Sequence, residues 1–260
     1  MSVDIEELVP ESPYVWRARR PGHRRRLICF PHAGAGAAAY TDWVEHLPAD
    51  LELVAVQLPG RQNRIAEEPF TEVGPLVRVL VHALRPVLDG PVSFFGHSCG
   101  AALAYELAQA LRSRGHRGPD QLFLSAQPAP GQPGARHLHE LPDDEFRAEI
   151  IRLGGVEAEI LADEDVMGSL LAVLRADFTL WERHRLTAGP PLECPVTVLS
   201  GTADPRSPVE TLSAWSACTT KDLTTRLYEG GHFYFLAELA DVVAFIDERT
   251  PTPATEGQTR

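Results

Sequence analysis

The sequence has 260 residues, of which 44% are hydrophobic and 23% charged, and its formal net charge is −12. This length suits one α/β domain that carries an insertion, and the acidic balance argues against general nucleic-acid binding. No uncharged apolar run reaches the length of a membrane span, and the N-terminus lacks the basic and then apolar order of a secretion signal. We therefore expect a cytoplasmic protein that does not associate with a membrane.

The first 24 residues are expected to form an N-terminal arm. Six arginines lie in this arm or directly after it: Arg17, Arg19, Arg20, Arg24, Arg25 and Arg26. One interpretation is a solvated, partly mobile edge of the fold, and the other is a docking patch for an acidic partner. The sequence leaves both open.

Short apolar runs alternate with amphipathic stretches through most of the remaining chain. The apolar runs predict strands at 27–31, 51–57, 92–95, 122–125 and 194–200, and helical spacing predicts helices at 73–88, 100–114 and 236–248. Such alternation is typical of βαβ units, which form a mostly parallel sheet with helices on both faces. We expect this core to comprise residues 25–126 and 191–249.

The alternation breaks between residues 127 and 190. A Pro- and Gly-rich loop is followed by helical patterns at 143–153, near 157–161 and at 166–184, with no strand pattern among them. We interpret this stretch as a helical lid inserted above the strand ends, although an ordinary set of sheet-covering helices is the alternative. Residues 250–260 contain little that could be buried, so we expect a disordered tail.

The segment Gly96-His97-Ser98-Cys99-Gly100 matches the G-x-S-x-G nucleophile elbow. An apolar strand precedes it and a helix rich in small residues follows it, as this sharp strand-to-helix turn requires. Side chains at the two glycine positions would clash in such a turn. The pattern therefore predicts that the Ser98 hydroxyl is the nucleophile of an α/β-hydrolase fold.

A serine nucleophile needs a histidine base and an acid, which follow it in the chain order Ser, Asp, His in this fold. Asp204 follows the strand at 194–200, and His232 follows Gly230-Gly231 just before the last helix. Asp204 is also a typical turn residue because it precedes a proline. Asp177 and Asp241 fit the acid's role less well, because both fall inside expected helices.

We expect His232 to take the proton of Ser98 and Asp204 to orient the imidazole. The oxyanion needs two donors, for which we predict the backbone N–H groups of Cys99 and Ala33. His97 is expected to pack and hydrogen-bond locally, and the Cys99 thiol is expected to point away from the reaction.

Metal chemistry has little support in the sequence. Cys29, Cys194 and Cys218 are expected to be buried free thiols, because no C-x-x-C pair or zinc-ligand spacing is present. His137 and His139 form an H-x-H pair without further ligands at a suitable spacing. We predict neither a metal site nor a bound cofactor.

Several longer strings resemble type II thioesterases of polyketide and nonribosomal peptide synthesis. They are F-P-H-A-G-A-G-A-A-A-Y-x-x-W from Phe30, A-V-Q-L-P-G-R-Q-N-R from Ala55, F-G-H-S-C-G, L-R-A-D-F from Leu174, G-x-x-D ending at Asp204, and G-G-H-F-Y-F from Gly230. The matches extend from about Leu27 to about Phe245. The chain departs from the family pattern at Ala35, where the family usually has glycine, and at Cys99, where it often has methionine.

The resemblance implies an editing enzyme that hydrolyses aberrant or stalled acyl groups from the phosphopantetheine arm of acyl or peptidyl carrier proteins. It places the family's triad on Ser98, Asp204 and His232 and its oxyanion donors on Ala33 and Cys99. The alternatives are a product-releasing thioesterase, a small-ester serine hydrolase, and a non-catalytic scaffold that binds carrier proteins. The partner would be an acyl or peptidyl carrier protein, and we expect the enzyme itself to be a monomer.

Two further expectations concern the surroundings of the site. The docking surface for an acidic carrier protein would be the cluster at 17–26, or Arg61 and Arg64. Leu174, Phe178 and Trp181 are candidates for lining the acyl pocket, although packing within the lid would explain them equally well.

Overall fold

The structure is a computed structural model that describes residues 7–132, 137–156 and 158–252. Most of the predicted tail, 250–260, lies outside these residues, as do the first six residues of the predicted arm. The described chain contains an eight-stranded sheet in the order β1-β2-β4-β3-β5-β6-β7-β8. The six strands from β4 to β8 in this order are parallel, namely β4 (Leu51–Val56), β3 (Arg25–Phe30), β5 (Val92–His97), β6 (Gln121–Ser125), β7 (Val196–Gly201) and β8 (Leu223–Tyr228).

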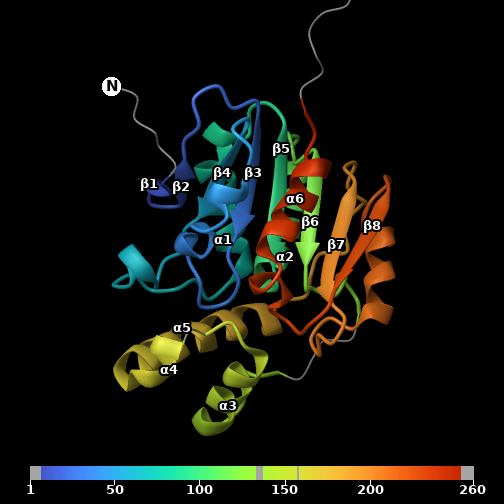
Figure 1. Cartoon of the computed structure of the whole chain (residues 1–260). Coiled ribbons are helices and arrows are strands. Elements are labelled where there is room, and N and C mark those ends of the chain that lie inside the picture. Colours follow the sequence, from blue (N-terminus) through green and yellow to red (C-terminus); the bar gives the residue numbers. More distant parts are fainter. Residues whose placement is uncertain (1–6, 133–136, 157, 253–260) are drawn as a thin grey trace, which may run out of the picture.

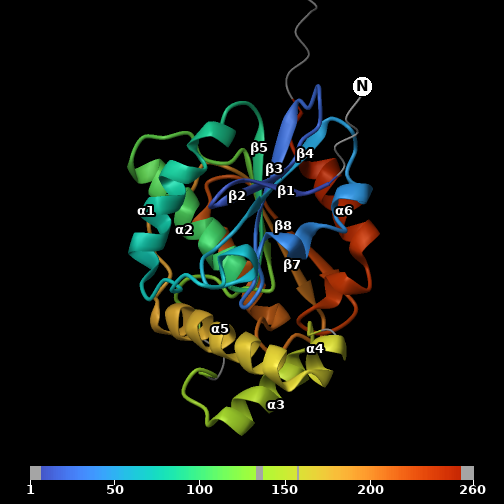
Figure 2. The same ribbon diagram turned by 90° about the vertical axis from the view of Figure 1, so that its left-hand side faces the viewer.

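Helices cover both faces of this sheet, as the sequence predicted. Helices α1 (Val73–Ala83) and α2 (Cys99–Ser113) lie on one face, and α6 (Leu239–Arg249) lies on the other (Figure 2). Side chains alternate between two buried clusters along each central strand: Ile28 and Phe30 join the cluster under α1 and α2, whereas Leu27 and Cys29 join the cluster under α6. Burial on both faces explains why these strands are continuous apolar runs.

A helical insertion, α3 (Asp143–Leu153), α4 (Ala158–Ala162) and α5 (Glu164–Arg183), lies at the end of the sheet toward which the parallel strands point (Figure 1). The carboxylate of Asp163 caps α5 by accepting the N–H groups of Asp165 and Val166, both at 3.0 Å. The insertion has a small apolar cluster of its own around Phe146 and Ile150. These helices were expected, and they lie beyond the strand ends rather than on a face of the sheet.

The remaining helical turns are short 3-10 helices at Ala37–Tyr40, Val44–His46, Gln62–Arg64, Arg85–Val87, Val209–Cys218 and Tyr234–Leu236. The first two follow β3 and bring Tyr40 and Trp43 onto the α6 face, where both are buried. The Tyr40 hydroxyl donates to the Phe30 carbonyl at 2.6 Å. This contact fixes the end of β3, from which the loop toward Ser98 departs.

The N-terminal residues differ from the predicted arm. Strands β1 (Val9–Ser12) and β2 (Val15–Ala18) form an antiparallel hairpin, and β2 pairs antiparallel with β4 over Val15–Ala18. β1 contains Pro10 and is mostly exposed, which suits an edge strand. Residues 9–18 of the predicted arm therefore form a hairpin that extends the sheet.

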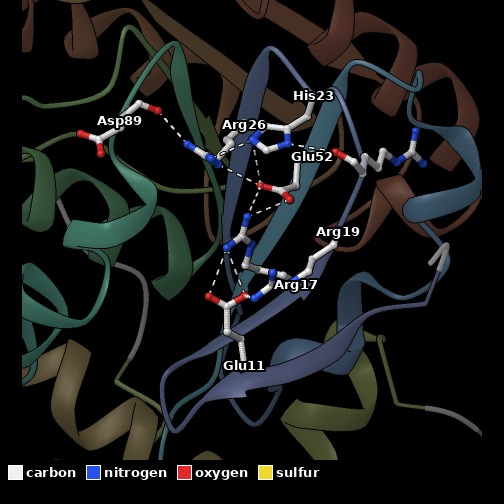
Figure 3. A network of polar contacts seen from close by, with 8 residues as sticks. Glu11, Arg17, Arg19, His23, Arg26, Glu52 and Asp89 are labelled. Atoms are coloured by element: carbon white, nitrogen blue, oxygen red, sulfur yellow. Dashed lines mark hydrogen bonds and ion pairs between the residues drawn. The ribbon is translucent and has the colours of Figure 1, made fainter. Parts of the chain in front are cut away.

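The six N-terminal arginines bind groups of the protein itself. Figure 3 shows Glu52, which is 1% exposed, at the centre of the largest group of contacts. Arg17 Nη2 donates to both its oxygens at 2.9 and 2.8 Å, and Arg26 Nε donates at 2.9 Å. Arg17 and Arg26 are therefore fixed within the fold, and their side chains are largely buried.

The other four arginines also have partners within the protein, although the side chains of Arg19 and Arg24 are 56% and 62% exposed. Arg19 pairs with Glu11, Arg24 and Arg25 pair with Asp50, and Arg20 donates to backbone carbonyls of the 3-10 turn at Val44–His46 and of the residues after it. Arg25 also reaches Asp247 at the end of α6 at 2.6 Å. The cluster thus ties the hairpin and the last helix to the amino ends of the parallel strands.

Replacing Glu52 by alanine should lower the free energy of unfolding by about 3 kcal/mol, because it leaves two largely buried guanidinium groups without their shared carboxylate. Urea denaturation measures this loss, with Glu68→Ala on an exposed loop as the control that leaves stability unchanged. Glu52 lies at the opposite end of the sheet from the helical insertion, so the change should leave the contacts around Ser98 intact. A variant as stable as the parent would show that the network contributes nothing to stability.

Candidate active site

Ser98 lies in the turn between β5 and α2. Its backbone angles are φ 55° and ψ −125°, a region that non-glycine residues rarely occupy. Such a conformation costs on the order of 1–3 kcal/mol and persists only where the surroundings enforce it. Here Ser98 N–H donates to the Ser125 carbonyl at 2.8 Å, and Ala101 N–H donates to the Ser98 carbonyl at 2.9 Å.

Two glycines make this turn possible. A Cβ at Gly96 would lie 2.2 Å from the Gly100 carbonyl oxygen, and a Cβ at Gly100 would lie 2.1 Å from the Phe30 carbonyl oxygen. Both contacts are with backbone, which cannot swing away as a side chain could. The first turn of α2 therefore lies very close to the end of β3, at the carbonyl groups of Phe30 and Pro31.

Asp204 and His232 come together across the loops after β7 and β8. His232 Nδ1 lies 2.9 Å from Asp204 Oδ2, and the two residues are 4% and 5% exposed. The second oxygen, Oδ1, accepts the Arg206 N–H at 2.9 Å, so the carboxylate has one orientation. A Cβ at Gly201 would lie 2.2 Å from the Gly231 carbonyl oxygen, which shows how tightly the histidine loop packs against the end of β7.

The other two aspartates considered for the acid's role have different partners. Asp241 lies on the exposed side of α6 and pairs with Arg226 at 3.4 Å. Asp177 on α5 pairs with Arg61 at 2.6 Å and accepts the Gly34 N–H at 2.8 Å. Of the three, Asp204 is the one whose carboxylate contacts His232.

The loop after β3 has the geometry of a tight turn. Ala35 N–H donates to the His32 carbonyl at 3.1 Å, and Gly34 has φ +76°. A positive φ at the third position of a turn favours glycine. The departure from the family pattern at Ala35 is accommodated, because Gly34 rather than Ala35 occupies the left-handed region. Ala33, the predicted oxyanion donor, lies within this turn.

Two buried histidines, His32 and His97, lie near His232. Burial lowers the pKa of His32 to about 4 and the pKa of His97 well below its usual value, and the charge of His232 acts in the same direction on both. His97 Nδ1 contacts Ser125 Oγ at 2.8 Å, and Ser125 Oγ contacts the Tyr234 hydroxyl at 2.7 Å. The expected local packing and hydrogen bonding of His97 are confirmed.

The Cys99 thiol is unsuited to attack. Burial raises the pKa of Cys99, and the nearby Asp177 carboxylate adds to the effect. The thiol is therefore protonated at neutral pH, whereas the thiolate is the nucleophilic form. Cys29, Cys194 and Cys218 are buried free thiols. Among the described residues, no group of three or more His, Cys, Asp or Glu side chains is placed to hold a metal ion.

Two cavities meet at Ser98. The first, of about 370 Å³, is lined by His232, by the loop at 32–36 and by apolar side chains of the insertion that include Ile150, Leu170 and Leu174. The second, of about 380 Å³, is lined by Cys99, by the loop at 126–132 and by Trp181 and Arg206. Phe178 lines both. The three predicted pocket residues thus face the site: Leu174 the first cavity, Trp181 the second and Phe178 both.

Arg61 and Arg64 were suggested as docking residues, and the structure contradicts this. They are 4% and 7% exposed. Arg64 pairs with Glu67, and its guanidinium lies over the Tyr14 ring at 4.2 Å. Arg61 pairs with Asp177. A carrier protein could not reach either guanidinium without displacing these partners.

The model of the thioesterase domain family matches residues 25–250, nearly the whole described chain. The chain is a member of the thioesterase domain family. It is 35% identical over 222 residues to the gramicidin S biosynthesis protein GrsT of Aneurinibacillus migulanus, which covers 85% of this chain and 87% of GrsT. This thioesterase accordingly shares the α/β-hydrolase fold of its solved relatives.

Two solved structures show how far the likeness extends. The thioesterase RedJ from the prodiginine biosynthetic pathway of Streptomyces coelicolor is 37% identical, with a TM-score of 0.82 over 87% of this chain and 90% of RedJ. The type II thioesterase BorB from the borrelidin biosynthetic cluster is 35% identical, with a TM-score of 0.85 over 94% of this chain and all of BorB. None of the helices in the described part of this thioesterase is long and apolar enough to cross a membrane.

Proposed function

We propose that this thioesterase hydrolyses aberrant or stalled acyl groups from the phosphopantetheine arm of acyl or peptidyl carrier proteins in polyketide or nonribosomal peptide synthesis. Membership of the thioesterase family supports the reaction. Similarity to GrsT, RedJ and the type II thioesterase BorB supports the setting, since each is named for a biosynthetic pathway or cluster. A cytoplasmic location and a monomeric state remain predictions.

The reaction begins at Ser98. His232 accepts the Ser98 proton while Oγ attacks the thioester carbonyl, and Asp204 holds the imidazole tautomer and stabilises the imidazolium. The negative oxygen of the tetrahedral intermediate accepts hydrogen bonds from the backbone N–H groups of Ala33 and Cys99. The carbon–sulfur bond then breaks, and the His232 imidazolium gives its proton to the departing thiolate, which leaves as the thiol.

The acyl-enzyme is hydrolysed by the same groups in reverse order. His232 takes a proton from water, the resulting hydroxide attacks the ester carbonyl, and the same two N–H groups hold the oxyanion. Ser98 leaves with the proton from His232, which releases a carboxylic acid. The protein needs no cofactor of its own for these steps, because phosphopantetheine belongs to the substrate.

The two cavities provide room for the two arms of a thioester. The reacting carbonyl carries an acyl chain on one side and the pantetheine sulfur on the other, and both must leave Ser98 in different directions. One cavity on each side of Phe178 meets this need. A small ester would leave much of this space unfilled, since the second cavity alone measures about 380 Å³.

One observation carries the proposal above the others: His232, whose Nδ1 lies 2.9 Å from Asp204 Oδ2, lines the same cavity as the strained Ser98. The test compares acetyl-, propionyl- and longer acyl-phosphopantetheinyl carrier proteins with the matching acyl-N-acetylcysteamine thioesters and p-nitrophenyl esters. We expect the highest kcat/KM for short acyl groups on carrier proteins.

Each alternative has its own signature in this experiment. A strong preference for one long acyl chain would identify a product-releasing thioesterase. Faster cleavage of p-nitrophenyl esters, with no benefit from the carrier protein, would identify a small-ester hydrolase. Binding of acyl-carrier protein without turnover would identify a scaffold. Any of these results would overturn the editing function.

A further inference from the structure

The ion pair between Asp177 and Arg61 lies beside the proposed oxyanion site and has no part in the triad. Asp177 lies in the middle of α5 and is 6% exposed, and Arg61 follows β4 and is 4% exposed. Arg61 Nη2 donates to Asp177 Oδ1 at 2.7 Å and to Oδ2 at 2.6 Å. The pair therefore joins the helical insertion to the sheet domain through a buried contact.

Asp177 makes a second contact, with the oxyanion loop. Its Oδ2 accepts the Gly34 N–H at 2.8 Å. That N–H belongs to the peptide group between Ala33 and Gly34, so the hydrogen bond fixes the plane of this peptide. The direction of the Ala33 N–H depends on the same turn, because the turn is only four residues long.

The shape of the turn makes this support necessary. Gly34 is in the left-handed region at φ +76°, and a Cβ there would lie 2.8 Å from Leu174 Cδ2. Glycine is compatible with many other backbone angles as well, so the residue type alone does not select this one. The carboxylate of Asp177 holds the loop in one of the conformations that glycine permits.

Burying an ion pair is costly, and replacing such a pair by apolar groups is often neutral or stabilising. The charged pair at this place is therefore better explained by its selecting one conformation of the loop at Gly34 than by a contribution to the stability of the fold. Both oxygens of the carboxylate are bound, by Arg61 and Gly34, whereas His232 Nδ1 is bound to Asp204.

We infer that Asp177, held by Arg61, is a positioning residue: it aligns the oxyanion loop and makes oxyanion stabilisation depend on α5 being seated against the sheet domain. The inference rests on the proposed function, because it assumes that the Ala33 N–H binds the oxyanion. Asp177 acts through Gly34 and does not touch the reacting atoms.

The experiment compares Asp177→Ala and Asp177→Asn on an acyl-N-acetylcysteamine thioester, with kcat and KM measured separately. Loss of one oxyanion donor costs roughly 10²–10³-fold in kcat, so we expect about a 10²-fold fall for Asp177→Ala with little change in KM. The asparagine oxygen still accepts from Gly34 but lacks the charge, so that variant should lose about 10-fold.

A second readout separates alignment from folding. An alkyl boronic acid that forms a tetrahedral adduct with Ser98 should bind more weakly to each variant in proportion to the fall in kcat. A non-hydrolysable thioether analogue of the substrate should bind as it does to the parent. A merely structural role would lower the thermal midpoint without changing the ratio of these two affinities.

Glu106→Gln is the matched control. Glu106 is another buried carboxylate, and it accepts from His184 and Thr187 just after α5 at 2.7–2.8 Å without contacting the oxyanion loop. The Glu106→Gln variant should be less stable than the parent and keep the parental kcat.

A parental kcat in either folded Asp177 variant would overturn the inference. So would an equal weakening of the binding of the boronic acid and of the thioether analogue. If Asp177→Ala does not fold, the kcat and the two ligand affinities of Asp177→Asn test the inference. If the wild-type enzyme itself shows no Ser98-dependent thioester hydrolysis, the proposed function fails instead.

Discussion

Replacing Ser98 by alanine should lower kcat for acyl-carrier protein at least about 10⁴-fold, because the triad works as a unit and no neighbouring group can replace its nucleophile. The Cys99 thiol, one residue further along, is the nearest chemical substitute. Its raised pKa keeps it protonated and therefore poorly nucleophilic. The residual rate should reflect only binding and the oxyanion hole.

The design of this test depends on non-additivity. The double variant Ser98→Ala/His232→Ala should be no slower than either single variant, because each removes the same catalytic step. Ser113→Ala, near the exposed end of the same helix α2, is the control and should keep the parental rate. A Ser98→Ala enzyme that keeps a tenth of the parental kcat would show that another group is the nucleophile.

The centre of the sheet could be predicted because both faces of its strands are buried. Continuous apolar runs mark β3, β4, β5, β6 and β7, and each was predicted within a few residues. The strands that the sequence analysis missed lie at the edges. β8 has the sequence LTTRLY and exposes the side chains at 225–227, so it lacks a continuous apolar run. β1 and β2 lie outside the βαβ alternation on which the prediction depended.

The candidate triad could be located because chain order and local motifs specify it. The elbow is a contiguous five-residue pattern, and the acid and base follow it in loops after strands. The Arg61–Asp177 pair joins residues 116 positions apart, and no local sequence pattern predicts such a contact. Both residues fell within the family-like strings at 55–64 and 174–178, which was the one available signal. The contacts of the N-terminal arginines could not be predicted for the same reason, since Arg17 binds Glu52, 35 positions later in the chain.

Replacing Gly100 by alanine should lower both the stability and the activity of the protein. The added Cβ would lie 2.1 Å from the Phe30 carbonyl oxygen and 2.7 Å from the Pro31 carbonyl oxygen. Overpacking typically costs 1–3 kcal/mol and more where backbone must move, so we expect a loss of about 3 kcal/mol in urea denaturation. The displaced segment leads into the oxyanion loop, so kcat of the folded fraction should also fall about 10²-fold.

Gly168→Ala is the control for this change. Gly168 lies within α5 on the exposed side, and no heavy atom lies within 4 Å of where its Cβ would be. The same methyl group there should raise stability by about 0.5–1 kcal/mol, because glycine loses more conformational freedom in a helix than alanine does. If Gly100→Ala lowers the free energy of unfolding and Gly168→Ala raises it, the loss at Gly100 comes from the close approach of α2 to β3 and not from the added methyl group itself. If Gly100→Ala instead folds normally and keeps its kcat, the turn at Ser98 does not require α2 to begin so close to the end of β3.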